Sequence, residues 1–143
     1  MGKGSFGVVY KGIKQSNGKE VAIKLENWNS PTITREFTVL KEMKGSPGFP
    51  ETYSLKNVGS FKALCMELLG DSLFQIFTES SRKRLGPTMV LTAFKQLLFR
   101  LESLHNRGFL HRDVKPQNML LGVNENKKRV YLIDFGLSRL FYD

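Results

Sequence analysis

The sequence predicts an α+β fold in which a strand-rich, antiparallel first region with one helix precedes a mainly helical second region. Two observations lead to this fold class. The apolar segments Val8–Tyr10 and Val21–Ile23 flank a polar stretch that contains Asn17-Gly18, a strong signal for a β-hairpin turn. After residues 67–70 ("ELLG"), apolar residues instead recur at helical spacing. We therefore expect two regions that differ in secondary structure.

The first region is expected to contain one helix and a second hairpin. Pro31 suits the first turn of a helix, where its missing N–H costs least, and Ser30 before it can cap that helix. Gly45 is expected to end the helix. The second hairpin turns near Asn57–Ser60, with Phe61–Met66 as its second strand. The apolar residues of the helix recur at i, i+4 and i+7: Ile33, Phe37 and Leu40.

Two helices are expected to open the second region. Asp71 or Ser72 can cap a short helix. A longer helix begins at the Gly-Pro pair 86–87, and two short strands, 119–121 and 130–133, follow it around a polar turn. The apolar residues of the longer helix recur at i, i+4, i+7, i+11 and i+14: Val90, Phe94, Leu97, Leu101 and Leu104.

Composition narrows the classes of protein. The 143 residues are 41% hydrophobic and 24% charged, as in a soluble globular domain. We expect no signal peptide and no membrane contact, because Met1 leads into glycines and a lysine and no apolar run is long enough to span a bilayer. The single cysteine, Cys65, cannot form an internal disulfide and lies in an apolar run, which favours a reducing compartment and a buried thiol.

The chain is basic, with a formal net charge of +9. Its densest clusters, residues 82–84 ("RKR") and 127–129 ("KKR"), stand beside serines and asparagines that are typical of solvated loops. Binding of acidic or phosphorylated partners, or of nucleic acid, is the alternative. Charge alone does not decide between these interpretations.

The N-terminus carries the glycine spacing G-x-G-x-x-G in Gly2, Gly4 and Gly7. A dinucleotide-binding fold would require this loop to open a helix, whereas here it leads into β-branched and aromatic residues. That pattern argues against such a fold even though Glu26 follows at about the 20-residue spacing of its ribose-binding acid. The GK[ST] ending of a P-loop is also absent. A glycine-rich hairpin that covers phosphates, with Phe6 at its tip, fits best.

Three more motifs follow in order. "VAIK" ends in Lys24 on the returning strand, "HRDVKPQN" covers residues 111–118 after the long helix, and "IDFG" closes the last strand with Asp134–Gly136. Together with the glycine loop, these motifs resemble the eukaryotic protein kinases over nearly the whole chain. The resemblance implies a two-lobed protein kinase fold. Residues 1–66 would form the N-lobe, 67–70 the hinge and 71–143 the first part of the C-lobe.

The resemblance also implies that the reaction is phosphoryl transfer from ATP with Mg²⁺. Lys24 would hold the α- and β-phosphates, and a carboxylate would fix it; Glu36 is favoured by resemblance over Glu42. Asp113 would orient the attacking hydroxyl, and Lys115 would neutralise the γ-phosphate. Oxygen atoms suit a hard cation, so the implied magnesium ligands are Asn118 and Asp134.

Further roles follow from the same resemblance. His111 and Phe135 would pack with Leu40 in an internal stack that aligns the two lobes. Met66 would be the gatekeeper, and Glu67 and Leu69 would offer backbone groups to adenine. The full set implied to bind nucleotide is Gly2, Gly4, Ser5, Phe6, Gly7, Val9, Ala22, Lys24, Met66, Glu67, Leu69 and Leu120.

The segments "VAIKLE", "MELLGDSL", "HRDVKPQNMLLG" and "YLIDFGLSRLFYD" are similar to the casein kinase 1 group, including its tau-tubulin kinase relatives. The spacing of Asp113 and Lys115 resembles that of serine/threonine kinases. The resemblance implies protein substrates with Ser or Thr near acidic or phosphorylated residues. We expect a monomer in the cytoplasm, with the nucleus as an alternative. We expect no membrane partner and, because no aromatic-basic motif is present, no nucleic-acid partner.

The resemblance further leads us to expect that the chain is truncated at both ends. The strand before Gly2 and the activation segment after residue 143 would lie outside it. We then expect the chain alone to be poorly stable and catalytically silent, with activity belonging to the longer kinase. The alternative is a naturally truncated, pseudokinase-like protein that binds nucleotide or a partner without catalysis.

Overall fold

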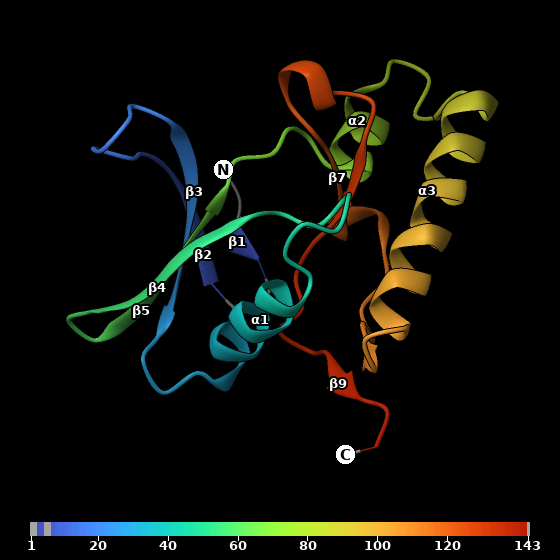
Figure 1. Ribbon diagram of the computed structural model, residues 1–143. Coiled ribbons are helices and arrows are strands. Elements are labelled where there is room, and N and C mark those ends of the chain that lie inside the picture. Colours follow the sequence, from blue (N-terminus) through green and yellow to red (C-terminus); the bar gives the residue numbers. More distant parts are fainter. Residues whose placement is uncertain (1–2, 5–6, 143) are drawn as a thin grey trace.

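The structure, a computed structural model, describes residues 3–4 and 7–142 and confirms the predicted α+β fold. Figure 1 shows an antiparallel sheet beside one helix on one side of the molecule and the remaining helices on the other. The elements of the first region are β1 (Lys3–Gly4), β2 (Gly7–Ile13), β3 (Glu20–Asn27), α1 (Pro31–Glu42), β4 (Thr52–Val58) and β5 (Phe61–Glu67).

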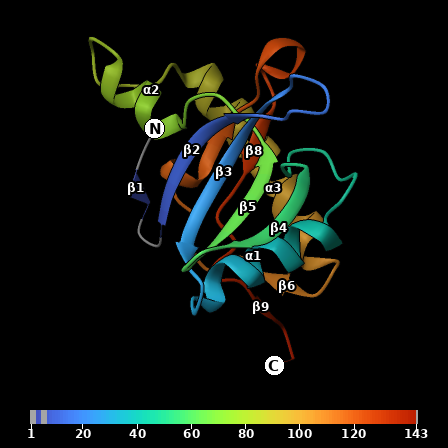
Figure 2. The ribbon, with the colours of Figure 1, turned by 90° about the vertical axis from the view of Figure 1, so that its left-hand side faces the viewer.

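The five strands of this region form one sheet in the order β1-β2-β3-β5-β4, and every neighbouring pair is antiparallel (Figure 2). The turn between β2 and β3 contains Gly18 at φ 70°, a left-handed conformation that glycine adopts without strain. Val9 on β2 stands opposite Lys24 on β3, and Ala22 stands opposite Met66 on β5. This register fixes which side chains of β3 share a face.

Helix α1 packs against β4 and β5 with Ile33 and Leu40 buried, as the sequence periodicity predicts. It begins at Pro31 as predicted, but the expected cap is wrong, because the Ser30 side chain makes no capping hydrogen bond to the helix. The Ser30 hydroxyl donates to Glu26 instead, at 2.7 Å. This charge-assisted hydrogen bond orients the Ser30 side chain toward Glu26 and not toward the first N–H groups of the helix.

The elements of the second region are α2 (Leu73–Glu79), α3 (Pro87–His105), β6 (Phe109–Leu110), η1 (Pro116–Asn118), β7 (Met119–Leu121), η2 (Asn124–Asn126), β8 (Val130–Leu132) and β9 (Arg139–Leu140). Ser72, and not Asp71, caps α2. Its hydroxyl accepts from the Gln75 N–H at 3.1 Å, and the Gln75 side chain accepts from the Ser72 N–H at 2.8 Å. This reciprocal pair is a capping box, so both donors at the helix start are satisfied.

Helix α3 turns only part of its apolar surface inward. Ala93, Leu97 and Leu104 are buried, whereas Val90 and Phe94 are 46% and 57% exposed. Next to the buried face, Arg100 donates to the carbonyl of Val130 on β8 at 3.2 Å, which draws that side of the helix onto the sheet of β7 and β8. Of the apolar residues that the sequence places on one face of this helix, some are therefore buried and others are exposed.

Other expectations from composition can be located in the structure. In the part of the chain that the structure describes, no helix is both long and apolar enough to cross a membrane. The basic clusters 82–84 and 127–129 are exposed in loops, as the simpler interpretation predicts. Cys65 is half-buried rather than buried, and burial raises the pKa of its thiol.

Candidate functional site

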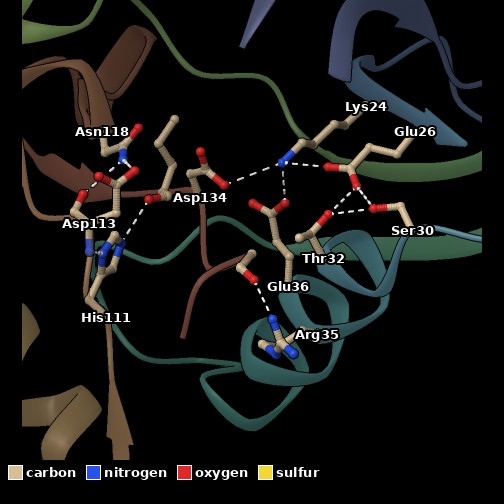
Figure 3. A network of polar contacts seen from close by, with 12 residues as sticks. Lys24, Glu26, Ser30, Thr32, Arg35, Glu36, His111, Asp113, Asn118 and Asp134 are labelled. Atoms are coloured by element: carbon tan, nitrogen blue, oxygen red, sulfur yellow. Dashed lines mark hydrogen bonds and ion pairs between the residues drawn. The ribbon is translucent and has the colours of Figure 1, made fainter. Parts of the chain in front are cut away.

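Lys24 lies at the centre of a buried cluster of charges between the sheet and α1 (Figure 3). Its Nζ lies 2.6 Å from Glu36 Oε2, 3.2 Å from Glu26 Oε1 and 3.4 Å from Asp134 Oδ1. Lys24, Glu26 and Glu36 are all buried. We call Lys24, Glu26, Glu36 and Asp134 the lysine cluster.

The carboxylates decide the charge state of this lysine. Burial by itself would lower the pKa of Lys24, but Glu36 and Asp134 outweigh it and raise that pKa above its ordinary value. Burial raises the pKa of Glu36, and the ammonium of Lys24 opposes that shift. Lys24 is thus held as an ammonium beside Glu36 and Asp134. Glu42, the alternative partner, is exposed at the end of α1.

A second cluster forms in the loop between β6 and β7, and we call Asp113, Lys115 and Asn118 the loop cluster. Asp113 Oδ2 lies 2.7 Å from Lys115 Nζ and accepts from Asn118 Nδ2 at 3.0 Å. The same Asn118 nitrogen donates to the Asp113 carbonyl at 2.9 Å. Asn118 Nδ2 is therefore occupied, and its Oδ1 is the side-chain atom left to meet a cation.

The two clusters meet where β8 ends. The Ile133 N–H donates to the carbonyl of Asn118 at 3.0 Å, so the residue before Asp134 lies directly against the loop cluster. Asp134 and Arg112 both adopt left-handed φ values, 63° and 67°, which cost energy in a residue other than glycine. Asp134 thus reaches Lys24 from a strained backbone beside Asn118.

His111 connects the loop cluster to the core of the molecule. Its ring packs edge-on against Phe135 with centroids 4.9 Å apart, and His111, Phe135 and Leu40 all lie in the core. His111 Nδ1 accepts from the Asp113 N–H at 3.2 Å, while Nε2 lies 2.9 Å from the Ile133 carbonyl. These partners fit a neutral ring that carries its proton on Nε2, and burial lowers the pKa of His111.

The apolar residues expected to hold adenine come from four strands, β2, β3, β5 and β7, and from the segment that follows β5. Ala22 and Met66 are buried, and Val9 on β2 packs against the same core. Leu69 and Leu120 are half-buried, and the Gly70 N–H donates to the Leu121 carbonyl at 2.8 Å, which joins residues 67–70 to β7. The backbone N–H of Glu67 already donates to the Glu51 carbonyl at 2.8 Å and is not open to a ligand.

The glycine loop is described only in part. Gly2, Ser5 and Phe6 lie outside the described residues, and Gly4 is the second residue of β1. Gly7 begins β2, and a methyl group there would overlap the Leu25 carbonyl oxygen on β3. This close approach of two backbones explains a glycine at position 7.

Three residues of the site were not found from the sequence: Glu26, Arg35 and Arg112. Arg35 donates to the Gly136 carbonyl and Arg112 to the Leu137 carbonyl, both at 2.7 Å. These bonds tie α1 and the loop cluster to the segment after Asp134. Glu26 could have been found from the sequence. Residues two apart on a strand point to the same face of the sheet, so Glu26 is expected on the same face as Lys24.

A buried lysine held by carboxylates beside a partly exposed aspartate and an asparagine suits an enzyme that binds phosphate groups and directs their transfer. Comparison with known families gives the particular class. The family model described as "protein kinase domain" matches residues 1–143, and the chain belongs to the protein kinase family. Phosphoryl transfer to proteins is the activity of this domain, and such domains use ATP and Mg²⁺.

Proposed function

We propose that this chain carries the catalytic residues of a serine/threonine kinase of the casein kinase 1 group, which transfers the γ-phosphoryl group of ATP to acidic or already phosphorylated proteins. The observation that carries the proposal is the meeting of the lysine cluster and the loop cluster, where the N–H of Ile133, the residue before Asp134, donates to the Asn118 carbonyl at 3.0 Å. Phosphoryl transfer needs positioned charges more than covalent chemistry, and these clusters supply them.

In this proposal Lys24 contacts the α- and β-phosphates, and Glu36 keeps its ammonium in place. Asp113 accepts a hydrogen bond from the substrate hydroxyl and aligns it for attack. Lys115 Nζ lies 2.7 Å from Asp113 Oδ2, and its positive charge would neutralise the γ-phosphate next to that carboxylate. A lysine at this position suits a small Ser or Thr hydroxyl substrate, which is the substrate class that the resemblance implies.

The residues present fit a magnesium ion. Asn118 Oδ1 is left open because the amide nitrogen is occupied by Asp113, and the Asp134 carboxylate follows a residue bonded to Asn118. Two oxygen ligands of this kind suit a hard cation that also binds substrate phosphates. When bound, Mg²⁺ supplies charge neutralisation, while Asn118 and Asp134 hold it.

The nucleotide would lie between the two regions, with residues 67–70 as the hinge, 1–66 as the N-lobe and 71–143 as the start of the C-lobe. Val9, Ala22, Met66, Leu69 and Leu120 would contact the adenine. The exposed clusters 82–84 and 127–129 and the net charge of +9 favour acidic substrates. We propose a monomer that acts in the cytoplasm or the nucleus.

Transfer of radiolabelled phosphate from Mg-ATP to matched peptides by the whole protein that contains these residues tests the proposal. One peptide carries Ser among aspartates, the second carries Ser among neutral residues, and the third replaces the Ser of the first with Tyr. We expect label on the first, less on the second and none on the third. Equal labelling of Ser and Tyr would contradict the substrate class, and calorimetric binding of Mg-ATP without transfer to any peptide would favour the non-catalytic alternative.

A further inference from the structure

Glu26 is a buried carboxylate to which the preceding sections assign no role. Its side chain is fully buried, and its Oε1 lies 3.2 Å from Lys24 Nζ. Lys24 already has Glu36 at 2.6 Å, so Glu26 is not needed merely to neutralise it. An extra buried carboxylate is costly unless several groups bind it. The groups that bind Glu26 therefore indicate why a carboxylate is buried at this position.

The other carboxylate oxygen of Glu26 binds the start of helix α1. Oε2 accepts from the Ser30 hydroxyl at 2.7 Å and from the Thr32 hydroxyl, and these two hydroxyl oxygens lie 2.7 Å apart. The helix begins at Pro31, between the two. Glu26 thus connects the strand that carries Lys24 to the first turn of the helix that carries Glu36 (Figure 3).

Two further contacts extend this connection. A methyl group built at Gly7 would lie 2.8 Å from Glu26 Cγ, so the first residue of β2 rests on the Glu26 side chain. One built at Gly136 would lie 3.1 Å from Thr32 Cβ, so the start of α1 also touches the segment that carries Asp134. Glu26 therefore contacts the start of β2, Lys24 and the first turn of α1, and Thr32 in that turn contacts the segment that carries Asp134.

We propose that Glu26 is a positioning residue for the kinase reaction, which holds Lys24 and the first turn of α1 in one arrangement through Ser30 and Thr32. This inference rests on the proposed function, since the lysine it positions is the one that would contact phosphate. Glu36 and Glu26 have different roles in this arrangement. Glu36 binds the ammonium with a hydrogen bond, and Glu26 fixes where β3 and α1 stand relative to each other.

The geometry at Oε1 supports positioning rather than simple charge pairing. Among the described residues, Glu26 Oε1 has no hydrogen-bond partner, although it lies within ion-pair distance of Lys24. It attracts the ammonium without taking the hydrogen bond that Glu36 holds. The attraction limits the places that Lys24 Nζ can occupy. Since Glu36 and Asp134 each accept one hydrogen bond from the ammonium, one N–H group remains to point at a ligand.

The test uses the whole protein that contains these residues, which serves as the parent chain, and four variants of it: Glu26→Gln, Thr32→Val, Thr32→Ser and Glu20→Gln. Glu26→Gln keeps the shape and removes the charge. Thr32→Val removes the hydroxyl, and Thr32→Ser restores it. Glu20→Gln is the matched control, since Glu20 is an exposed residue of the same strand. The Kd of Mg-ATP is measured by calorimetry, KM for ATP and kcat by peptide phosphorylation, and Tm by calorimetric scanning.

We expect Glu26→Gln to raise Kd and KM for ATP about 10-fold, as loss of an outer partner of a functional group does. Thr32→Val should change both in the same direction by a smaller factor, about 3-fold, and Thr32→Ser should return them to the parent values. Glu20→Gln should leave both unchanged. Each comparison is made well below the lowest Tm, so that loss of folded protein does not enter the constants.

Distinct outcomes overturn the inference and the function beneath it. If the parent chain binds Mg-ATP and Glu26→Gln lowers only Tm, with Kd and KM unchanged or tighter, Glu26 is structural and the inference is wrong. If Thr32→Ser behaves like Thr32→Val, the hydroxyl link is wrong. If the parent chain neither binds Mg-ATP nor transfers phosphate, the proposed function fails, and the role of Glu26 fails with it.

Discussion

The two clusters of the site differ in how far their charges are buried. In the lysine cluster, Lys24, Glu26 and Glu36 are all less than a tenth exposed, and only the Asp134 side chain, 20% exposed, reaches solvent. In the loop cluster, the side chains of Lys115 and Asp113 remain 37% and 21% exposed. Buried charges are held by the fold that surrounds them, whereas half-exposed charges can reach a substrate. The surrounding fold therefore fixes most of the lysine cluster in place, whereas the charges of Asp113 and Lys115 in the loop cluster are open to solvent.

This difference has an energetic consequence. A charge left alone in the core is costly, so changes in the lysine cluster should affect stability and function together. A charge left alone near the surface remains hydrated, so changes in the loop cluster should affect function with little loss of stability. Separate measurement of the two properties can therefore confirm or break the comparison.

The largest expected effect is that of Asp113→Asn on catalysis. Asparagine keeps the shape of the side chain but cannot act as a base, and loss of a general base costs about 10²–10⁴ in rate. The free energy of unfolding should change little, because Asp113 is half-exposed. Peptide phosphorylation and urea denaturation check the two halves. A variant with near-parental kcat would remove Asp113 from the chemistry.

The second effect is on the lysine cluster. Lys24→Met keeps much of the side-chain volume but leaves Glu36 and Glu26 buried without their cation. Breaking a buried pair in this way costs about 3–5 kcal/mol in the free energy of unfolding, and Mg-ATP binding should be lost as well. Urea denaturation and calorimetry measure these changes. Loss of binding at unchanged stability would show that the lysine cluster behaves like the loop cluster.

Protonation of His111, which packs against the loop cluster, should make the free energy of unfolding depend on pH. Burial lowers the pKa of His111 in the folded chain, so the unfolded chain takes up the proton first as pH falls. The free energy of unfolding is therefore fully retained above the unfolded pKa, about 6.5, and declines below it. The slope approaches about 1.4 kcal/mol per pH unit until the folded chain is protonated too.

The control for His111 is the other histidine, His105, at the exposed end of α3. Urea denaturation at pH 5 and pH 7 is compared for the parent chain, His111→Gln and His105→Gln. The difference between the two pH values should shrink in His111→Gln and persist in His105→Gln. An equal pH dependence in all three chains would mean that His111 is protonated as easily in the folded chain as in the unfolded one.

Much of the fold could be predicted because local patterns determine it. Asn17-Gly18 and Pro31 place a turn and a helix start, and the structure has both there. The proximity of Lys24 and Glu36 was less accessible, since periodicity allowed Glu42 as well and only resemblance favoured Glu36. Packing of α1 on β4 and β5 decides it, by burying Glu36 and leaving Glu42 in solvent.

What the sequence could not predict depends on contacts between distant segments. Ser30 is an ordinary helix cap by its position, and only the buried Glu26 four residues earlier gives its hydroxyl another partner. The regular apolar spacing of α3 likewise does not show that Leu97 and Leu104 are buried while Val90 and Phe94 stay exposed. In both places contacts with a distant segment, such as the bond from Arg100 to the Val130 carbonyl, complete what the local pattern leaves open.

The smallest effect provides the sharpest reference for the lysine cluster. Lys11 forms an ion pair with Glu20 between β2 and β3, one strand away from Lys24, and both side chains are about half exposed. Lys11→Met should therefore cost at most about 1 kcal/mol in the free energy of unfolding, because water screens the pair and rehydrates the carboxylate left behind. The measurement is urea denaturation beside Lys24→Met, at low and high salt. The same substitution is made in both cases, so burial alone separates the two results. A loss for Lys11→Met as large as that for Lys24→Met would mean that removal of a lysine from this sheet, and not exposure of buried carboxylates, destabilises the chain.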